Sequence, residues 1–292
     1  MRPVFEWNLV TRSLELGKRT LVMGIVNVTP DSFSDGGEHF TCETAIAHAL
    51  TLLSEGADMI DVGGESTRPG ANVAEDGPAV TAEEELRRIL PVIAGIKKAA
   101  PTAIVSVDTY KAVVAKAAVE AGAEIVNDVS GFQWDPEMLK ALAGLNCGAV
   151  LMHARGRPDE WHALPAVADI VVLVKRELRE RAEGAVFAGI KRGRLVLDPG
   201  FGFGKRFEEN YPLLQRFSEF HELRFPLLAG VSRKSFIGRA LARNGKDAAL
   251  EDRSAGTLSA EVIAAGKGAH IIRTHSVKAA VEALRIVDLV SA

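Results

Sequence analysis

Short apolar runs and amphipathic stretches alternate along most of the chain. The apolar runs are rich in Val and Ile, which is typical of buried strands. They occupy residues 21–28, 58–64, 103–109, 124–130, 148–154, 195–200, 227–233 and 270–276. Between them, segments such as 43–57, 82–100 and 111–123 carry apolar residues at i, i+3 and i+4. That spacing predicts helices with one buried face.

Alternating strands and helices indicate parallel strands joined by right-handed crossovers. Eight such units over residues 21–292 predict an α/β fold of the (β/α)₈ TIM-barrel type, built as a single domain. A doubly wound open sheet remains as the alternative, because the pattern alone does not show closure. Residues 1–20 precede the units, and segment 4–16 predicts a short β-hairpin that could cover the barrel floor. The most loop-like interruption is 155–166, after the fifth strand.

Composition and charge narrow the class of protein. The 292 residues are 47% hydrophobic and 25% charged, which suits one large globular core. A net charge of −3 argues against general affinity for nucleic acid or anionic membranes. The N-terminal residues lack the apolar core of a signal peptide, and no run approaches the roughly 18 apolar residues of a membrane span. Cys42 and Cys147 form no close motif, so we expect a reduced, cytoplasmic protein.

Polar side chains stand at the carboxyl end of every predicted strand. In a TIM barrel these ends meet at one mouth. The set comprises Asn27, Asp61, Asp108, Thr109, Asn127, Asp128, His153, Asp198, Ser232, Arg233, Lys234, Arg273 and His275. A single residue of this kind is often a turn or N-cap device, an interpretation that fits Asp128 and Thr109. The convergence of acids and cations predicts a binding site, because unpaired buried charges cost several kcal/mol each, roughly.

Two chemistries separate within this set. Asp108, Asn127 and Asp198 suit a heterocycle with an N–H edge, since a carboxylate accepts two parallel N–H bonds from a 2-amino-4-oxo ring. Lys234 can donate to a ring nitrogen or carbonyl. Arg68, Arg273 and His275 form a cationic group, which Ser66, Thr67 and the glycines of 63–70 extend with hydroxyls and accessible backbone. This second pocket suits a phosphate or pyrophosphate.

The glycine run DPGFGFGK at 198–205 does not match a nucleotide-binding loop, because it lacks both a Walker ending and a G-x-G-x-x-G spacing. Its alternation with Phe201 and Phe203 favours a flexible rim that places an aromatic ring over a flat ligand. For Phe201, a turn that packs the ring inward is an equally good interpretation.

Five motifs together resemble the dihydropteroate synthase family: GIVNVTPDSFSDGG (24–37), DVGGESTRPGA (61–71), DPGFGFGK (198–205), GVSRKSFIG (230–238) and IIRTHSV (271–277). The resemblance covers about residues 21–290. It implies a cytoplasmic transferase of folate biosynthesis, a sulfonamide target, that joins 4-aminobenzoate to 6-hydroxymethyl-7,8-dihydropterin pyrophosphate. It further implies Mg²⁺ as cofactor, small molecules as substrates, a homodimer, and no nucleic-acid or membrane partner.

The resemblance also implies roles for individual residues. The residues expected to bind the pterin ring are Asp108, Asn127, Asp198 and Lys234, with Met152 and Phe203 lining the ring slot. Asn27 is expected to bind Mg²⁺, and pyrophosphate is expected to be bound by Thr67, Arg68, Arg273 and His275. The arylamine is expected in a slot beside Ser235 and the stem of Lys234. Arg68, Lys234, Arg273 and His275 would be the catalytic residues. The loops 29–37 and 64–72 are expected to close over pyrophosphate and complete that slot.

Two departures and two alternatives qualify the resemblance. Ala154, Arg155 and Gly156 stand where the family usually has Met-Gln-Gly, which puts the contacts of the fifth loop in question. Ser276 replaces a more usual acid or amide, which could change how His275 is oriented. The alternatives are a methyltransferase domain that uses methyltetrahydrofolate and a catalytically silent pterin-binding barrel. The motifs STRPG and RTH argue against the methyltransferase, because that reaction has no pyrophosphate leaving group.

Overall fold

The computed structural model describes residues 2–29, 42–65 and 80–291 and shows a ring of parallel strands. The strands are β3 (Leu21–Asn27), β4 (Met59–Gly63), β5 (Val105–Asp108), β6 (Ile125–Asp128), β7 (Gly148–Met152), β8 (Leu195–Asp198), β9 (Leu228–Ala229) and β10 (Ile271–Thr274). They pair in the order β8-β7-β6-β5-β4-β3-β10-β9. A parallel bridge between Leu197 and Leu227 joins the two outer strands. The TIM-barrel prediction is therefore confirmed, and the open-sheet alternative is excluded.

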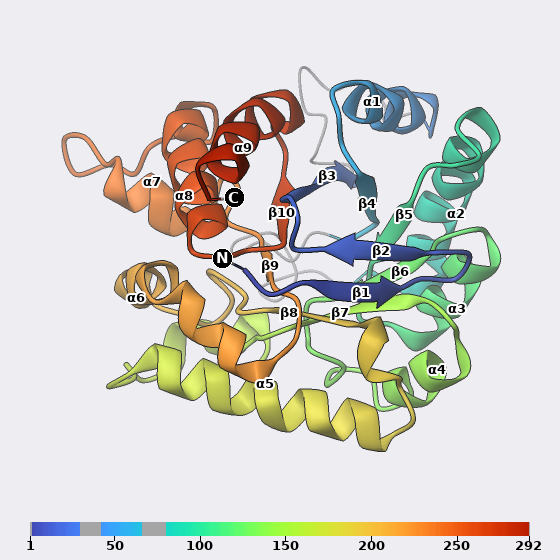
Figure 1. The fold of residues 1–292 in the computed structure, drawn as a ribbon, viewed down its shortest axis with the longest axis horizontal. Helices are drawn as coiled ribbons and strands as arrows, with labels where there is room; N and C mark the ends of the chain where they lie inside the picture. Colours follow the sequence, from blue (N-terminus) through green and yellow to red (C-terminus); the bar gives the residue numbers. More distant parts are fainter. Residues whose placement is uncertain (1, 30–41, 66–79, 292) are drawn as a thin grey trace.

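Helices surround this ring (Figure 1). They are α1 (Cys42–Ser54), α2 (Ala82–Ala99), α3 (Ala112–Glu120), α4 (Met138–Gly144), α5 (Ile170–Phe187), α6 (Asn210–Gln215), α7 (Ser235–Ala240), α8 (Ser254–Gly266) and α9 (Val277–Ser291). Side chains cap the N-termini of α2 and α5: Thr81 accepts from Glu84 N, and Asp169 accepts from Val171 N and Val172 N. Within the described ranges, none of the helices is long and apolar enough to cross a membrane.

Side chains alternate between the outside and the inside of the ring along each strand, as the pleat requires. Outward residues such as Val126, Leu151 and Ile272 join the large core beneath the helices. Inward residues near the strand starts, such as Ile125 and Ile271, form a second apolar cluster. The barrel therefore has one hydrophobic layer outside the strands and another that fills its floor.

A hairpin covers this floor, as the segment 4–16 predicted. Strands β1 (Phe5–Asn8) and β2 (Ser13–Leu16) pair antiparallel and lie across the end of the ring (Figure 1). Trp7 is fully buried in the floor cluster, and its indole Nε1 donates to Arg194 O at 2.9 Å. A Cβ on Gly148 would lie 2.6 Å from Leu9 Cδ2, so the hairpin packs directly against the start of β7. The hairpin does not cover the opposite end of the barrel, where the strands have their carboxyl ends.

Candidate active site

The inward side chains change from apolar to polar towards the carboxyl ends of the strands. On β4, Met59 lies in the floor and Asp61, two residues later, lies in the mouth; on β6, Ile125 and Asn127 repeat the pattern. The resulting polar layer comprises Asn27, Asp61, Asp108, Asn127, Asp198 and Arg273. These strands pair in parallel, so the register alone brings side chains far apart in the sequence to one level.

Arg273 on β10 connects the acids of this layer. Its Nε donates to Asp61 Oδ2 at 2.6 Å, and its Nη2 donates to Asp108 Oδ2 at 2.8 Å. Asn127 Nδ2 donates to the same Asp61 oxygen at 2.9 Å. The sequence placed Arg273 with the anion pocket and Asp108 with the ring pocket. The structure joins them in one network, because buried charges are stable only with hydrogen-bonded partners.

Burial raises the pKa of Asp108 to about 7. The charge of Arg273 opposes this rise, and the carboxylate of Asp61 adds to it. A carboxyl group in this state holds a proton part of the time at neutral pH, and a ligand that donates to it would favour its charged form. A perturbed acid in a concave mouth is typical of a functional site.

Asp198 ends β8 and lies on the same interior face. Its Oδ1 accepts from Gly200 N at 2.7 Å. A Cβ on Gly230 would lie 3.6 Å from Oδ2, so the glycine leaves room beside the carboxylate. Burial raises the pKa of Asp198 to about 6, and the Gly200 N–H and the charge of Lys234 oppose this rise. The carboxylate is thus fixed by its own loop and flanked by a cation.

An apolar wall stands beside Asp198. Met152 and Phe203 belong to one buried cluster, and Trp161 packs edge-on against Phe203 with ring centroids 5.3 Å apart. Lys234 Nζ lies 4.0 Å from the centroid of the Phe203 ring, a cation–π contact. Ser235 begins α7 directly after Lys234. The structure therefore brings together the side chains predicted to line a slot for a flat ring.

His275 follows β10 and is oriented by Ser232, which follows β9. Ser232 Oγ accepts from His275 N at 3.2 Å and lies 2.9 Å from His275 Nδ1. The hydroxyl can donate to Nδ1 or accept from it, depending on the imidazole tautomer, and in either case it holds the ring in place. Ser276 N donates to Thr274 Oγ1 at 3.1 Å, so the backbone at this departure from the family pattern is held in place. Ser232 therefore contacts both the backbone and the ring of His275.

Asn27 ends β3 opposite Gly63 of β4. It is half-buried, and its side chain has no hydrogen-bond partner within 2–29, 42–65 and 80–291. The same ranges hold no group of three His, Cys, Asp or Glu that could bind a metal ion. Mg²⁺ usually keeps several waters and takes one or two protein oxygens plus substrate phosphates. A single amide oxygen beside an anion pocket fits that mode of binding.

Part of the predicted site lies outside the described residues. This applies to Thr67 and Arg68, to Ser66 and Gly70, and to nearly all of the two predicted closing loops. At the last described position before the second gap, Glu65 accepts from Tyr110 Oη at 3.2 Å and pairs with Lys111. Arg88 Nη1 donates to Gly64 O at 2.8 Å. The stem of that segment is therefore anchored to α2 and to the residues after β5.

Comparisons with known proteins give the same assignment along nearly the whole chain. Residues 23–275 match the family model described as pterin binding enzyme. The chain is 46% identical over 267 residues to dihydropteroate synthase of Escherichia coli strain K12, covering 91% of this chain and 90% of the relative. The chain belongs to the dihydropteroate synthase family.

Two solved structures of family members superpose closely. Xanthomonas albilineans dihydropteroate synthase with 4-aminobenzoic acid has 46% identity and a TM-score of 0.88 over 99% of each chain. Yersinia pestis dihydropteroate synthase in a sulfonamide drug complex has 42% identity and a TM-score of 0.88 over 98% of each chain. The sequence motifs, the barrel and the relatives therefore agree on the family.

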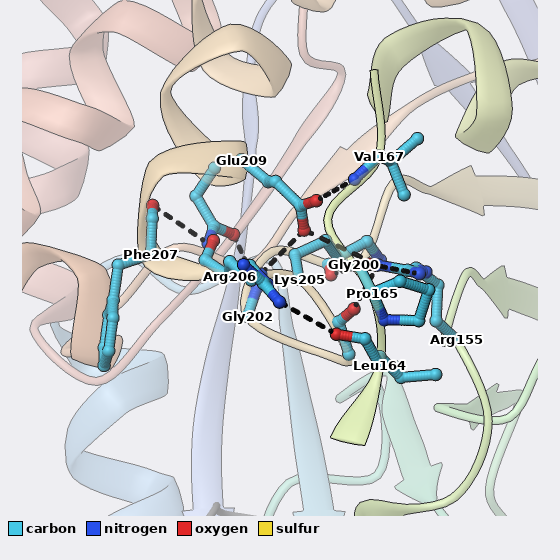
Figure 2. A network of polar contacts seen from close by, with 12 residues as sticks. Arg155, Leu164, Pro165, Val167, Gly200, Gly202, Lys205, Arg206, Phe207 and Glu209 are labelled. Carbon is cyan, nitrogen blue, oxygen red and sulfur yellow. Dashed lines mark hydrogen bonds and ion pairs between the residues drawn. The ribbon is translucent and has the colours of Figure 1, made fainter. Parts of the chain in front are cut away.

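The fifth loop is where this chain departs from the usual pattern of the dihydropteroate synthase family. Arg155 stands in it and bonds to the loop after β8, where Nη1 donates to Gly204 O at 3.2 Å. Its Nη2 donates to Pro165 O at 3.0 Å, and Nη1 lies 3.6 Å from Glu209 Oε2 (Figure 2). The unusual arginine thus ties two loops of the mouth to each other.

The structure corrects the expectation for His153 and decides between the two interpretations of Phe201. His153 does not point into the mouth: it lies on the outward parity of β7, where Nε2 is 3.1 Å from Glu177 Oε2 of α5. Phe201 packs inward, stacked between Phe217 and Phe236, so only Phe203 faces the slot. The glycine loop is consequently part core and part wall, not a free rim.

The sequence also left two residues without a role. Asp61 was placed in the mouth but given no function, although it accepts from both Arg273 and Asn127. Its position two residues after the floor residue Met59 was the available signal. Lys205 was seen only as the end of the glycine run, and nothing in its sequence spacing shows that it is buried. As expected, Asp128 is a turn device, since its Oδ1 accepts from Ser130 N at 2.7 Å.

Proposed function

We propose that this chain condenses 6-hydroxymethyl-7,8-dihydropterin pyrophosphate with 4-aminobenzoate to give 7,8-dihydropteroate and pyrophosphate. One observation carries the proposal: buried and half-buried acids and cations from separate strands meet at the mouth beside the Phe203 wall. Folate biosynthesis is the pathway that family membership indicates. The whole chain resembles synthases of similar length, which favours this activity over a methyltransferase domain or a silent barrel.

The pterin ring would lie between the acids and the aromatic wall. Asp198 would accept the 2-amino and ring N–H groups in parallel, as a carboxylate accepts a guanidinium. Asn127 and Asp108 would bind further positions on the ring, and Lys234 would donate to a ring nitrogen or carbonyl. Binding would restore the charged form of Asp108 and Asp198, whose pKa values burial raises.

In the reaction, the bond between the pterin methylene carbon and the pyrophosphate oxygen breaks, and a carbon–nitrogen bond to the arylamine forms. The amine nitrogen loses a proton, which the released pyrophosphate can accept. Arg273, His275 and Arg68 would stabilise the departing anion electrostatically. The acids around the ring would stabilise positive charge that develops on the pterin as the anion leaves.

Mg²⁺ is proposed as the cofactor, with Asn27 as its ligand from the protein. When bound, the ion would neutralise part of the charge on the pyrophosphate. Thr67 and Arg68 are proposed to hold the same anion. We keep the expectation that 4-aminobenzoate binds well only once pyrophosphate and Mg²⁺ are present, in a slot near Ser235.

The decisive assay follows pyrophosphate release by the purified protein. The proposal requires release that depends jointly on the pterin pyrophosphate, 4-aminobenzoate and Mg²⁺. Release that does not require the arylamine would indicate simple hydrolysis, and the proposal would then be wrong. Methyl transfer from methyltetrahydrofolate, without pyrophosphate release, would favour the methyltransferase alternative.

We also propose a homodimer, with α8 and α9 at the interface. Ile286, Leu289 and Val290 of α9 are 62%, 71% and 82% exposed, and their spacing places them on one face. Ile263 of the adjacent α8 is also exposed. Leu289→Glu should convert a dimer into a monomer in light scattering, whereas Phe187→Glu on α5 should not. A wild-type monomer at micromolar concentration would contradict the proposal.

A cytoplasmic location is proposed on the basis of the cysteines. Cys42 and Cys147 are both free thiols, and Cys147 is buried beside Arg194. Free thiols persist in reducing compartments. Fractionation of cells that express the protein, followed by immunoblotting, would test the location, and recovery outside the cytoplasm would contradict it.

A further inference from the structure

Lys205 is a buried cation to which neither the family resemblance nor the proposed reaction assigns a role. It is the last residue of the glycine-rich loop after β8, and it is only 7% exposed. Nζ lies 2.8 Å from His153 O, 2.8 Å from Pro199 O and 2.7 Å from Gly200 O. His153 Nδ1 is a fourth neighbour at 2.8 Å. The ammonium thus joins the end of β7 to the end of β8.

His153 extends this contact to the helix layer. Burial holds the pKa of His153 well below its usual value, with the positive charge of Lys205 as the next cause, so the ring is neutral. His153 Nε2 lies 3.1 Å from Glu177 Oε2 of α5. Because a carboxylate can only accept, Nε2 carries the ring proton and donates it to Glu177. Nδ1 is then one of four acceptors around Lys205 Nζ, which the three N–H donors of the ammonium share. Arg181 Nη2 bonds to the same Glu177 oxygen at 3.0 Å.

The loop that Lys205 holds carries two predicted ring contacts. Asp198 Oδ1 accepts from Gly200 N, and Asp198 O accepts from His153 N at 2.8 Å. Gly200 has φ +69°, and a Cβ there would lie 1.9 Å from His153 O, so the two strand ends approach at backbone contact. Phe203 lies between Gly200 and Lys205. Fixing both ends of this turn therefore fixes the Asp198 carboxylate and the Phe203 ring.

We propose that Lys205 is a positioning residue for the pterin site: its ammonium locks the turn 198–205 against the end of β7 and so sets the place of Asp198 and Phe203. The inference rests on the proposed function, because it concerns how the same mouth recognises the pterin ring. Lys205 acts through these two residues and not on the reacting atoms. Arg155 donates to a carbonyl of the same turn and pairs with Glu209 (Figure 2).

The chain offers a matched control at the opposite end of the barrel. Arg194 is also a buried cation that donates to backbone carbonyls, with Nε 2.6 Å from Cys147 O and Nη2 2.7 Å from Leu142 O. Lys205→Met and Arg194→Met each remove such a cation and leave carbonyls without a donor. Both variants should lose thermal stability. Only Lys205→Met should disturb the ring site.

The experiment titrates 6-hydroxymethylpterin into wild type and both variants by calorimetry at 25 °C, after circular dichroism has shown each to be folded. We expect Lys205→Met to bind the pterin at least tenfold more weakly and Arg194→Met to bind within twofold of wild type. If Lys205→Met does not fold, Lys205→Gln replaces it. The amide keeps donors for the carbonyls but no charge, and we expect at least a threefold loss.

The pH dependence of pterin binding supplies a readout that a purely structural role would not move. Around Asp198 stand the Gly200 N–H, Lys234 from the turn after β9, Arg273 from β10, and Lys205 itself. Burial lowers the pKa of Lys205 well below its usual value, and the charge of Asp198 opposes that shift. When Lys205 is protonated, its charge lowers the pKa of Asp198, so removal of the lysine raises that pKa. Protonated Asp198 cannot accept two N–H bonds. Binding should therefore fail on acidification at a higher pH in Lys205→Met than in wild type.

The outcomes separate this inference from the proposed function. Weaker binding and an upward pH shift in Lys205→Met, with neither in Arg194→Met, support the positioning role. Pterin affinity within twofold of wild type in folded Lys205→Met overturns it, and so does an equal loss in Arg194→Met. A wild-type protein that does not bind the pterin overturns the proposed function first, and this inference with it.

Discussion

The floor and the mouth of the barrel are built by the same strands, yet Arg194 in the floor and the acids in the mouth are partnered differently. In the floor, the buried cation Arg194 has carbonyl partners, and Trp7 closes the apolar layer over it. In the mouth, Asp61 Oδ1 is buried without a hydrogen-bond partner among the residues that the structure describes, and burial raises the pKa of Asp108 and Asp198. A stable fold needs the first arrangement, whereas the second costs stability that a ligand can restore.

Substitutions in the floor and in the mouth should therefore have different effects. Two residues along one strand separate a side chain that supports the fold from one that serves binding, as in Met59 and Asp61. Changes in the floor should lower stability and leave binding intact. Changes in the mouth should lower binding and leave stability nearly intact, or raise it.

The largest expected effect is on the floor. Trp7→Ala removes a fully buried indole that packs against the strand starts and donates to Arg194 O. Loss of this packing should lower the free energy of unfolding by about 3–5 kcal/mol. Urea denaturation measures the loss, and kcat measured well below the midpoint should stay within twofold of wild type. Phe187→Ala, at a 95% exposed aromatic, is the control and should cost little. An inactive but fully stable Trp7→Ala would contradict the expectation that the floor supports stability and not activity.

The next effect is on the mouth. Asp198→Asn keeps an oxygen for Gly200 N but presents an NH₂ group towards the ligand, where an acceptor is needed. The lost charge-assisted bond is worth about 1.5–3 kcal/mol, so pterin affinity should fall about tenfold or more. Calorimetry with 6-hydroxymethylpterin measures it. Asp128→Asn, another buried acid but on the outward side of β6, should bind normally. Equal losses in both variants would contradict the assignment.

The smallest effect concerns pH. Burial raises the pKa of Asp198 to about 6 and that of Asp108 to about 7, above their usual value of 3.8. The folded protein therefore binds more protons than the unfolded chain between about pH 4 and 7, and these two acids favour folding less as pH rises through that window. Asp198→Asn removes one of them, so the ligand-free variant should gain stability relative to wild type as pH rises.

The gain expected at pH 7 over pH 4 is on the order of 1 kcal/mol, or about 2–4 °C in Tm for a chain of this size. Differential scanning calorimetry of both proteins at several pH values measures it. A constant difference between the two Tm values across the window would show that Asp198 keeps a normal pKa in the folded state.

The fold could be predicted from the sequence because its signals are local and repeated. Each Val- and Ile-rich run became a strand, and each amphipathic segment quoted for a helix became one. Closure could not be read from the pattern, since it rests on the single bridge between Leu197 and Leu227. The hairpin was visible as a separate apolar segment, and its place on the floor depends on tertiary packing of Trp7.

The site was predictable as a group of residues but not as a network. Asp108, Asn127, Asp198 and Arg273 do meet at the mouth, yet the contact of Arg273 with Asp61 needs three-dimensional positions. His153 was wrongly expected in the mouth, because side chains alternate between the inside and the outside of the barrel along a strand and this alternation was not applied at the end of β7. The roles of Lys205 and Arg155 could not be foreseen, because each acts through backbone carbonyls that the sequence does not position.

The central claim is that the acids of the mouth exist to bind a pterin ring. A crystal structure of the protein with 6-hydroxymethylpterin tests it most directly. We expect the 2-amino-4-oxo edge within hydrogen-bond distance of the Asp198 carboxylate, Asn127 beside the same ring, and Phe203 lining its slot. A ring bound elsewhere on the barrel, or bound at the mouth without contact to Asp198, would contradict it.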